Sequence, residues 1–321
     1  MTDAIVADLA GRRIRVGLDV GGTKIDAVAV SPSDEIVARL RRPTGWGEDA
    51  VVVSILDAID ALADEGGFAR SDIESVGIGI PGLVDADTGR VLHAVNLGVE
   101  SLDLAGQVGG RLGIPVRVEN DVKAAALGAA VLRGIDGSMA YLNLGTGVAA
   151  GIVVDGTIWR GARGTAGEVG HLSVDPNGRL CGCGQRGCIE TFCGGGALAR
   201  AWERPGALPV RDILDAADAG DERAAGLRAD LFHGAAAAVR ALVLSADVER
   251  VIIGGGLTAL GDRLLAGVRA ALQDGAAASP FMRSLHLDER VELLPAGSPA
   301  AAFGAAVVGA STPSKEIVSH G

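Results

Sequence analysis

The chain has 321 residues and a formal net charge of −11, with 48% apolar and only 3% aromatic residues. The length suggests two domains, and the apolar share can form cores of Val, Ile, Leu and Ala, as in α/β proteins with buried parallel strands. The acidic balance argues against nucleic-acid binding as the main activity, because an acidic surface repels phosphodiester backbones.

Neither a membrane span nor a leader segment is expected. The most apolar stretch, residues 138–154, contains Asn143 and a glycine turn, so we interpret it as two strands. Met1 to Arg13 contains acidic residues and no apolar signal-peptide segment, which predicts a cytoplasmic protein with reduced thiols. All the cysteines lie between residues 181 and 193, and in that compartment they indicate a metal site rather than disulfides.

The first part of the chain predicts an α/β unit. Apolar runs bounded by turn residues predict strands at 14–19, 25–31, 35–42, 76–80 and 116–119. Apolar residues at helical spacing predict helices at 49–65, 103–112 and 121–132. The first of these helices ends at Gly66-Gly67, a typical helix stop.

The rest of the chain predicts a second α/β unit around an irregular segment. Strands are predicted at 140–144, 149–154, 250–253 and 291–294. Helices are predicted within 197–217, at 221–245, from about 261 and at 299–308, with an irregular tail beyond Ser311. Both parts contain a strand, a glycine–threonine turn and a returning strand, which suggests a duplicated unit. Residues 161–196, rich in Gly and Cys, are interpreted as a functional insertion held by a metal.

Three glycine turns follow predicted strands. They are Asp19-Val20-Gly21-Gly22-Thr23-Lys24, Gly145-Thr146-Gly147 and Gly254-Gly255-Gly256. Such turns let backbone N–H groups approach phosphate oxygens, and Asp19 could hold magnesium, because hard cations prefer carboxylates. A simple hairpin turn would also explain the first one, but the repetition favours phosphate binding. None of the three matches a Walker A loop or a dinucleotide fingerprint.

A polar triplet, Glu119-Asn120-Asp121, follows an apolar strand and precedes a helix. Helix N-capping explains one of these residues, since Asn and Asp are preferred caps. It does not explain three in a row. Phosphoryl transfer needs a carboxylate that accepts the proton of the attacking hydroxyl. We therefore favour Asp121 as a general base and Asn120 as a second contact to the same substrate.

The cysteine cluster has the spacing of a zinc site. Cys181, Cys183 and Cys188 lie close together, and His171 precedes them. Zinc accepts three thiolates and one imidazole in tetrahedral geometry, and four protein ligands leave no open position, so the metal would be structural. Cys193 is an alternative fourth ligand, but its apolar neighbours favour His171.

Glu168, His171 and Glu190 are tied to this metal-held segment. Burying two carboxylates and an imidazole without partners is costly. The hydroxyl groups of a sugar would satisfy them, because a carboxylate accepts two hydrogen bonds side by side. The alternative is that Glu168 and Glu190 are solvated loop charges, as isolated glutamates usually are.

These residues together resemble the ROK family of sugar kinases and regulators. The segment 164–171, Gly-Thr-Ala-Gly-Glu-Val-Gly-His, resembles its ExGH motif, and 181–190 matches every fixed position of its CxCGxxGCxE motif. Residues 19–24 resemble the DxGGTK phosphate motif and Asn120-Asp121 the catalytic pair, while 79–82 resembles a GxPG turn near the sugar. The resemblance runs from about Arg15 to Gly309, nearly the whole chain.

The resemblance implies an actin-like ATPase (RNase H-like) α/β fold with two domains and a central cleft. The small domain would contain residues 1–119 and, through a returning helix, 300–321; the large domain would be 120–299, with the zinc module at about 161–196. It also implies Asp121 as the base for the sugar 6-hydroxyl, and sugar contacts from Asn120, Glu168, His171, Glu190, Gly82 and Asn96. Self-association as a homodimer or homotetramer is expected as well.

The implied reaction is transfer of phosphate from MgATP to a hexose, most simply glucose, with Zn²⁺ as a structural ion. N-acetylmannosamine, N-acetylglucosamine, fructose and mannose kinases share the motifs, so the choice of sugar stays open. A transcriptional regulator is a weaker alternative, because only 13 residues precede the first strand. Polyphosphate as donor is disfavoured, since in the family that donor is associated with chains that lack the cysteine cluster.

Two positions depart from the family pattern. Lys123 stands where members often have a small or amide residue, and it could lower the pKa of Asp121, reach a phosphate or face solvent. The second glycine turn is preceded by Asn143, so no acid matches Asp19 there. This puts a second carboxylate ligand for the metal in doubt but leaves phosphate binding intact.

Overall fold

Two five-stranded mixed sheets organise the chain, one in each of two units. The computed structural model describes residues 13–204, 206 and 208–311, so residues 1–12 and the predicted irregular tail beyond Ser311 lie outside the described residues. Unit 1 contains the chain up to Leu132 and again from Pro299, and unit 2 contains Arg133–Ser298. The domain division expected at 119/120 and 299/300 stays a prediction, although helix α4 (Asp121–Arg133) groups with unit 1.

The sheet of unit 1 has the strand order β3-β2-β1-β4-β8. Its strands are β1 (Ile14–Val20), β2 (Lys24–Val30), β3 (Ile36–Pro43), β4 (Ile73–Ile80) and β8 (Val116–Asn120). Its helices are α2 (Glu48–Gly66), α3 (Leu104–Leu112), α4 and α11 (Ala300–Ala310), with short 3-10 turns η1 (Arg70–Asp72) and η2 (Val95–Leu97). A small antiparallel sheet adds β5 (Leu83–Asp85), β6 (Arg90–Ala94) and β7 (Val99–Asp103).

The carboxyl ends of four strands of this sheet lie at one edge. β1 pairs in parallel with β4, and β4 with β8, while β2 is antiparallel to both β1 and β3. β3 therefore runs in the same direction as β1. We call the side where β1, β3, β4 and β8 end the carboxyl edge, the usual ligand-binding side of open α/β sheets.

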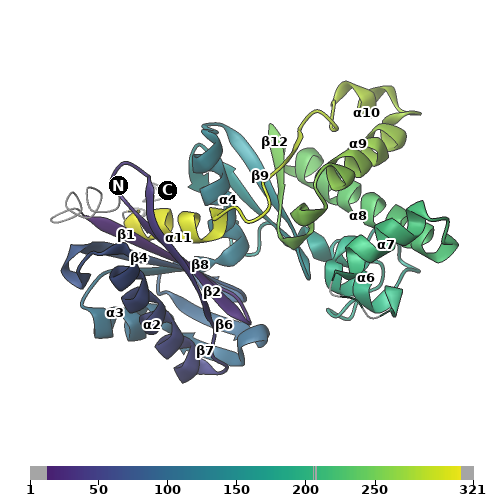
Figure 1. The fold of residues 1–321 in the computed structure, drawn as a ribbon. Helices are drawn as coiled ribbons and strands as arrows, with labels where there is room; N and C mark the ends of the chain where they lie inside the picture. Colours follow the sequence, from purple (N-terminus) through teal and green to yellow (C-terminus); the bar gives the residue numbers. More distant parts are fainter. Residues whose placement is uncertain (1–12, 205, 207, 312–321) are drawn as a thin grey trace. The chain divides into compact units, whose positions relative to one another are not determined.

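Helices lie on both faces of this sheet, α2 and α3 on one side and α11 on the other (Figure 1). Val16 and Leu18 of β1 belong to the same core cluster as α2 and α3. Val28 and Val30 of β2 pack instead with Phe303 of α11. This follows from the period of two in a strand, and it places the C-terminal helix on the opposite face of the sheet from α2 and α3.

Glycines let α11 approach its neighbours more closely than side chains would allow. A Cβ at Gly77 of β4 would lie 1.7 Å from the carbonyl oxygen of Ala305, and one at Gly304 would lie 1.8 Å from that of Ala124. Both obstacles are backbone atoms, which cannot rotate away. The helix is thus in backbone contact with the sheet on one side and with α4 on the other.

Unit 2 repeats the same sheet plan with the order β11-β10-β9-β12-β13. Its strands are β9 (Ser138–Leu144), β10 (Val148–Val154), β11 (Thr157–Ile158), β12 (Arg250–Gly254) and β13 (Val291–Leu293). Its helices are α5 (Ile189–Cys193), α6 (Gly195–Trp202), α7 (Pro209–Asp218), α8 (Glu222–Ala246), α9 (Asp262–Ala276) and α10 (Pro280–Ser284), with 3-10 turns η3 (Val169–His171) and η4 (Gly256–Leu260). The predicted duplication of the α/β unit is confirmed.

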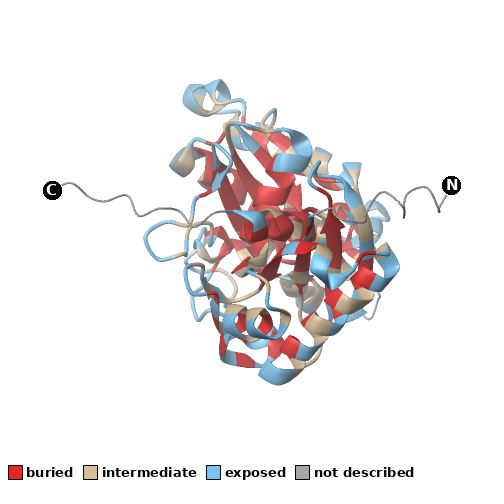
Figure 2. Cartoon of the chain, turned by 90° about the vertical axis from the view of Figure 1, so that its left-hand side faces the viewer, coloured by how far each residue is buried: buried red, intermediate tan, exposed pale blue. Residues whose placement is uncertain are grey.

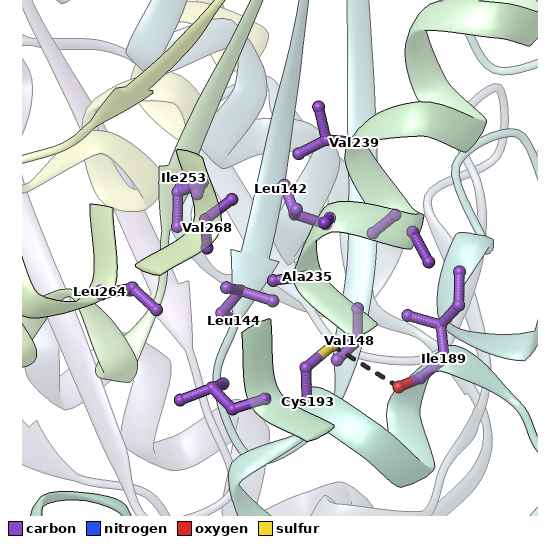
Figure 3. Close-up of a cluster of buried hydrophobic side chains, with 14 of the residues drawn as sticks. Leu142, Leu144, Val148, Ile189, Cys193, Ala235, Val239, Ile253, Leu264 and Val268 are labelled. Atoms are coloured by element: carbon purple, nitrogen blue, oxygen red, sulfur yellow. Dashed lines mark hydrogen bonds between the residues drawn. The ribbon is translucent and has the colours of Figure 1, made fainter. Parts of the chain in front are cut away.

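The core of unit 2 is aliphatic, as the composition predicts. Figure 3 shows Leu142 and Leu144 of β9 beside Val239 of α8 and Val268 of α9. Figure 2 shows that buried residues gather in the sheets and on the helix faces turned toward them. By length and composition, α8 is the one helix in the described chain that could span a membrane, but half of its most apolar window is buried in this unit.

The predicted strands and helices are confirmed with shifted ends. The short helices α5, inside the segment expected to be irregular, and α10 were not predicted, and there are two further differences. The region 197–217 contains two helices, α6 and α7, where the periodicity alone did not separate them. The small sheet of β5, β6 and β7 was not predicted, because its strands are short and partly exposed and give no clear alternation.

The close approach of α11 leads to a test with two glycines of unit 1. Gly304→Ala should lower the free energy of unfolding by at least about 2 kcal/mol, because the new methyl group meets backbone atoms that cannot move away. Gly110→Ala in α3 is the control. An added Cβ there meets nothing within 4 Å, so the helix should gain about 0.5–1 kcal/mol. Urea unfolding measures the free energy of unfolding of the two variants. Equal stability of the two would contradict the close backbone packing of α11.

Candidate functional site

The carboxyl edge of unit 1 gathers its predicted site residues. Asp19 lies near the end of β1, in register with Asp26 of β2 and Gly79 of β4. The glycine turn that follows is closed by a 2.9 Å hydrogen bond from the Gly21 N–H to the Lys24 carbonyl oxygen. Thr23 and Lys24 complete this turn, and both are exposed.

Asn96 and Gly82 also lie at this edge. A Cβ at Gly22 would come within 2.7 Å of the Asn96 carbonyl oxygen, so η2 lies directly against the glycine turn. Gly82 has a φ of 101° and its Cβ position is 2.7 Å from the carbonyl oxygen of Leu92, which only glycine tolerates. Its own carbonyl oxygen accepts a 3.3 Å hydrogen bond from the Asn120 side chain.

Asn120 is the residue that caps α4. Its Oδ1 accepts hydrogen bonds from the backbone N–H groups of Val122, at 3.1 Å, and Lys123, at 3.2 Å. Asp121, the first residue of the helix, accepts a 2.9 Å bond from Val122 N–H. Because Asn120 performs the capping, helix capping does not account for the carboxylate of Asp121.

The carboxylates at this edge influence one another. The pKa of Asp19 is raised to about 7, first by its burial and then by the negative charges of Asp121 and Asp26. Asp26 itself is paired with Arg41, whose Nε donates a 2.7 Å hydrogen bond to Asp26 Oδ1. Asp19 therefore lies where a cation would be stabilised, beside one carboxylate already paired with an arginine.

Two more ionisable residues of this segment are buried. Glu119 is 2% exposed and accepts a hydrogen bond from the Asn120 N–H at 2.9 Å. Lys123 is only 4% exposed. The suggestion that Lys123 faces solvent is therefore wrong. It lies in the first turn of α4, and every residue of this helix from 122 to 130 is buried.

In unit 2, two of the predicted glycine turns meet. β9 and β12 are adjacent and parallel, with Asn143 opposite Gly254, so the turns that follow them lie together. A pocket of about 450 Å³ opens there. Its lining includes Gly145, Thr146 and Gly256 from the predicted turns; Gly147, Gly254 and Gly255 lie beside it in the same turns but are not among the lining residues.

Another glycine run, which contains Gly195 and Gly196 and was not predicted as a site, completes this pocket. The N–H of Gly195 donates to the Gly145 carbonyl oxygen at 2.8 Å, and that of Gly196 to Thr146 at 2.9 Å. The far wall is formed by residues of α7 and η4, among them Leu208, Val210, Arg211 and Leu257. The signal that could have identified it is Gly194-Gly195-Gly196 at the start of a helix.

His171, Cys181, Cys183 and Cys188 form one cluster, which we call the metal cluster. Their ligand atoms all lie within 4.8 Å of one another. Cys181 Sγ is 3.8 Å from His171 Nδ1, and Cys183 Sγ is 3.7 Å from Cys188 Sγ. Two sulfurs bound to one zinc at tetrahedral angles would be about 3.8 Å apart, so the donor set and spacing fit this ion.

Cys193, the alternative ligand, is excluded. It is fully buried in the apolar core, and its Sγ–H donates to the Ile189 carbonyl oxygen at 3.5 Å (Figure 3). Burial also raises its pKa. The prediction of His171 as the fourth member of the cluster is therefore favoured by the geometry.

Thiols of the metal cluster differ in acidity. The pKa of Cys183 is lowered to about 6, first because the Gln185 backbone and side-chain N–H groups donate to its sulfur. The pKa of Cys188 is raised to about 12, first because it is buried. A cation bound by all of them would stabilise each thiolate, including those of the buried Cys181 and Cys188.

The predicted sugar contacts of unit 2 include His171 of this cluster and two glutamates that are close to cluster residues in the sequence. Glu190 Oε2 accepts a 3.0 Å hydrogen bond from the N–H of Val148, next to the second glycine turn. Glu168 is exposed and precedes η3, whose last residue is His171. Glu190 is thus held against a strand and is no freely solvated charge, whereas Glu168 is open to solvent.

The segment that contains the metal cluster is also anchored to α8. Arg179 forms a 2.8 Å ion pair with Asp230 of α8, and its guanidinium lies 5.3 Å from the ring centroid of Phe192. Such a pair on an aromatic face favours arginine over lysine. The segment therefore has support beyond the metal cluster itself.

Two mixed sheets of the same order, each with a glycine turn after its first strand, define the actin-like ATPase class, and solved structures agree. The chain resembles a ROK family glucokinase from Streptomyces griseus, solved in complex with glucose and AMPPNP, with a TM-score of 0.76 and 30% identity over 92% of this chain and 99% of that one. It also resembles the ROK hexokinase from Thermus thermophilus, with a TM-score of 0.75 and 32% identity over 92% of this chain and 97% of that one.

The chain belongs to the ROK family, whose pattern matches residues 15–310. The glucokinase of Halalkalibacterium halodurans is 34% identical over 79% of this chain and 83% of that protein. The N-acetylmannosamine kinase of Haemophilus influenzae is 32% identical over 81% of this chain and 85% of that protein.

The raised pKa of Asp19 predicts a pH dependence of stability in metal-free protein. Between pH 4 and pH 7 the folded state holds a proton on Asp19 that the unfolded chain releases, so the free energy of unfolding should fall as pH rises through this range. Asp19→Asn should remove this part of the slope.

Thermal unfolding between pH 5 and pH 8 with a magnesium chelator measures the effect. The difference in Tm between Asp19→Asn and the wild type should grow as pH rises toward 7 and then level off. A difference that stays constant with pH would show that Asp19 titrates normally.

Proposed function

We propose that this protein transfers the γ-phosphoryl group of ATP to the 6-hydroxyl of a hexose, most simply glucose, giving hexose 6-phosphate and ADP. The observation that carries the proposal is the pairing at the end of β8: Asn120 caps the helix, while Asp121 brings its carboxylate to the edge where Asp19 and the glycine turn lie. The similarity to sugar kinases, including one bound to glucose and an ATP analogue, supports the same reaction.

Asp121 would act as the general base. Its carboxylate accepts the proton of the sugar hydroxyl as that oxygen attacks phosphorus. The bond from Val122 N–H to one carboxylate oxygen fixes the side chain in place. Asn120, held by Gly82 and by the helix N-terminus, would donate to a neighbouring sugar hydroxyl.

The phosphates would be held by backbone N–H groups of the glycine turns. In unit 1, Asp19, Gly21, Gly22, Thr23 and Lys24 would bind the phosphate end. Asp19 would help to hold the Mg²⁺ that accompanies ATP, which would supply positive charge to the transferring group. In unit 2, Gly145, Thr146 and Gly147 with Gly254, Gly255 and Gly256 frame the pocket of about 450 Å³. Its apolar wall of Leu208, Val210 and Leu257 suits the flat face of a nucleobase.

Sugar specificity would come from side chains that pair with hydroxyl groups. The proposed sugar contacts are Asn96 and Gly82 in unit 1 and Glu168, His171 and Glu190 in unit 2. A site built to hydrogen-bond several hydroxyls rejects analogues that lack them, because its polar groups are then left unpaired. If these contacts are needed to order the site, a water molecule cannot replace the sugar hydroxyl as acceptor of the phosphoryl group, because it cannot make them.

The metal cluster would hold one Zn²⁺ with a structural role. Four protein ligands leave no position for water or substrate, so the ion would not take part in the reaction. It would hold His171 and, through the short segment from Cys188 to Glu190, the carboxylate that faces the second glycine turn.

An N-acetylmannosamine substrate is the second candidate, because a kinase for that sugar is similar over most of the chain.

A cytoplasmic location and association into a dimer or tetramer stay predictions.

A coupled assay of ADP release across a sugar panel tests the proposal. With MgATP, glucose should give the highest kcat/KM among glucose, mannose, fructose, N-acetylglucosamine and N-acetylmannosamine. A preference for N-acetylmannosamine would select the second candidate. No turnover with any of them would contradict a hexose kinase.

Asp121→Asn is the matched variant for this assay. The amide keeps an oxygen that can accept from Val122 N–H but cannot take up a proton, so kcat should fall by about 10²–10⁴-fold with the Tm unchanged. Turnover close to that of the wild type would exclude Asp121 as the base.

Zinc removal is predicted to weaken both fold and sugar binding. Metal analysis of purified protein should find one zinc per chain, and chelation should lower the Tm and raise the KM for the sugar together. Cys183→Ser should abolish zinc binding, whereas Cys193→Ser, outside the metal cluster, should retain it. Active protein without zinc would refute the structural role of the ion.

A further inference from the structure

Trp46 is unusually exposed for its residue type. It lies in the loop between β3 and α2, and 69% of its surface is accessible. The other tryptophans, Trp159 and Trp202, are 48% and 2% exposed. Tryptophan is on average highly buried in folded proteins, so a ring left this open calls for a physical reason.

The loop that carries Trp46 is firmly anchored. The N–H of Thr44 donates to the carbonyl oxygen of Thr23 at 3.2 Å, and that of Gly47 donates to the carbonyl oxygen of Leu97 at 2.8 Å. Gly45 N–H donates to Ser54 Oγ at 2.9 Å. The loop is thus bonded to the glycine turn on one side and to η2 on the other.

The indole ring itself has a defined position. It lies against Gly98, where a Cβ would come within 2.6 Å of the ring atoms Cε2 and Nε1. Gly98 adopts a φ of 67°, which glycine permits without strain. Asn96, a predicted sugar contact, lies two residues before this glycine, and Val95 beside it is 76% exposed.

The loop lies at the carboxyl edge. β3 runs in the same direction as β1, and its last residue, Pro43, is paired with Lys24 at the start of β2. Trp46 therefore follows the end of β3 as Asp121 follows the end of β8, and Asp19 lies near the end of β1 at the same edge. Beside carboxylates and glycines, it offers a large exposed apolar surface at this edge, together with the smaller Val95.

We propose that Trp46 is a specificity-determining residue on whose indole face the hexose acceptor stacks. A hexose combines polar hydroxyls with apolar C–H faces, and its weakly positive C–H hydrogens complement the negative face of an indole. The carboxylates and Asn96 would pair with the hydroxyls, while Trp46 and Val95 would cover the C–H face. This inference rests on the proposed hexose kinase function and adds a residue that contacts the C–H face of the sugar ring.

Steady-state kinetics separate this role from a structural one. Trp46→Ala should raise the KM for the sugar about tenfold, through lost apolar burial, while kcat, the KM for ATP and the Tm stay unchanged. Trp46→Phe keeps an aromatic face and should lie between the two. Trp159→Phe, in unit 2 on another exposed surface, is the control and should match the wild type.

Tryptophan fluorescence without nucleotide gives an independent readout. Adding the best hexose of the panel should change the emission of the wild type and of Trp159→Phe, and the change should vanish in Trp46→Phe. An unaltered sugar KM in Trp46→Ala, or an emission change that persists in Trp46→Phe, would overturn the inference while hexose phosphorylation stands. A wild type that phosphorylates no hexose would instead overturn the proposed function and this inference with it.

Discussion

Parallel pairing of β1, β4 and β8 is the constraint on which the chemistry of unit 1 depends. It aligns the ends of three strands that are far apart in the sequence, so Asp121 comes close enough for its charge to raise the pKa of Asp19. Like charges at a half-buried edge are costly unless a cation joins them. Arg41 offsets the neighbouring Asp26, and a bound magnesium would do the same for Asp19.

The helix α11 covers one face of this sheet. Val28 and Val30 on one face of β2 would be exposed without α11, which covers them with Phe303. Glycines at 77 and 304 bring the helix into backbone contact with the sheet and with α4. Because α4 begins at Asp121, the packing of a segment near the end of the chain helps to hold the start of the helix on which the proposed base lies.

In unit 2 a short stretch of chain connects the metal cluster to the glycine-lined pocket. Cys188 belongs to the cluster, Glu190 bonds to the backbone beside the second glycine turn, and Gly195 and Gly196 bond to that turn directly. The helix α5 between them packs on α8 through Cys193 and Gly234. A metal bound at one end would therefore restrain the other end, which is how a structural ion can affect a site without touching the reacting atoms.

Local patterns in the sequence determined the elements and the chemistry of the motifs. The cysteine spacing, the glycine turns and the triplet at 119–121 depend on residues near one another in the chain, and so do most strands and helices. Tertiary structure decided what depends on distant contacts. It fixed the cap residue Asn120 by a bond to Gly82, placed Cys193 in the core, buried Lys123 and added Gly195 and Gly196 to the pocket. The exposure of Trp46 could not be read from the sequence either, because it depends on Gly98 and on hydrogen bonds to Thr23 and Leu97, which only folding brings together.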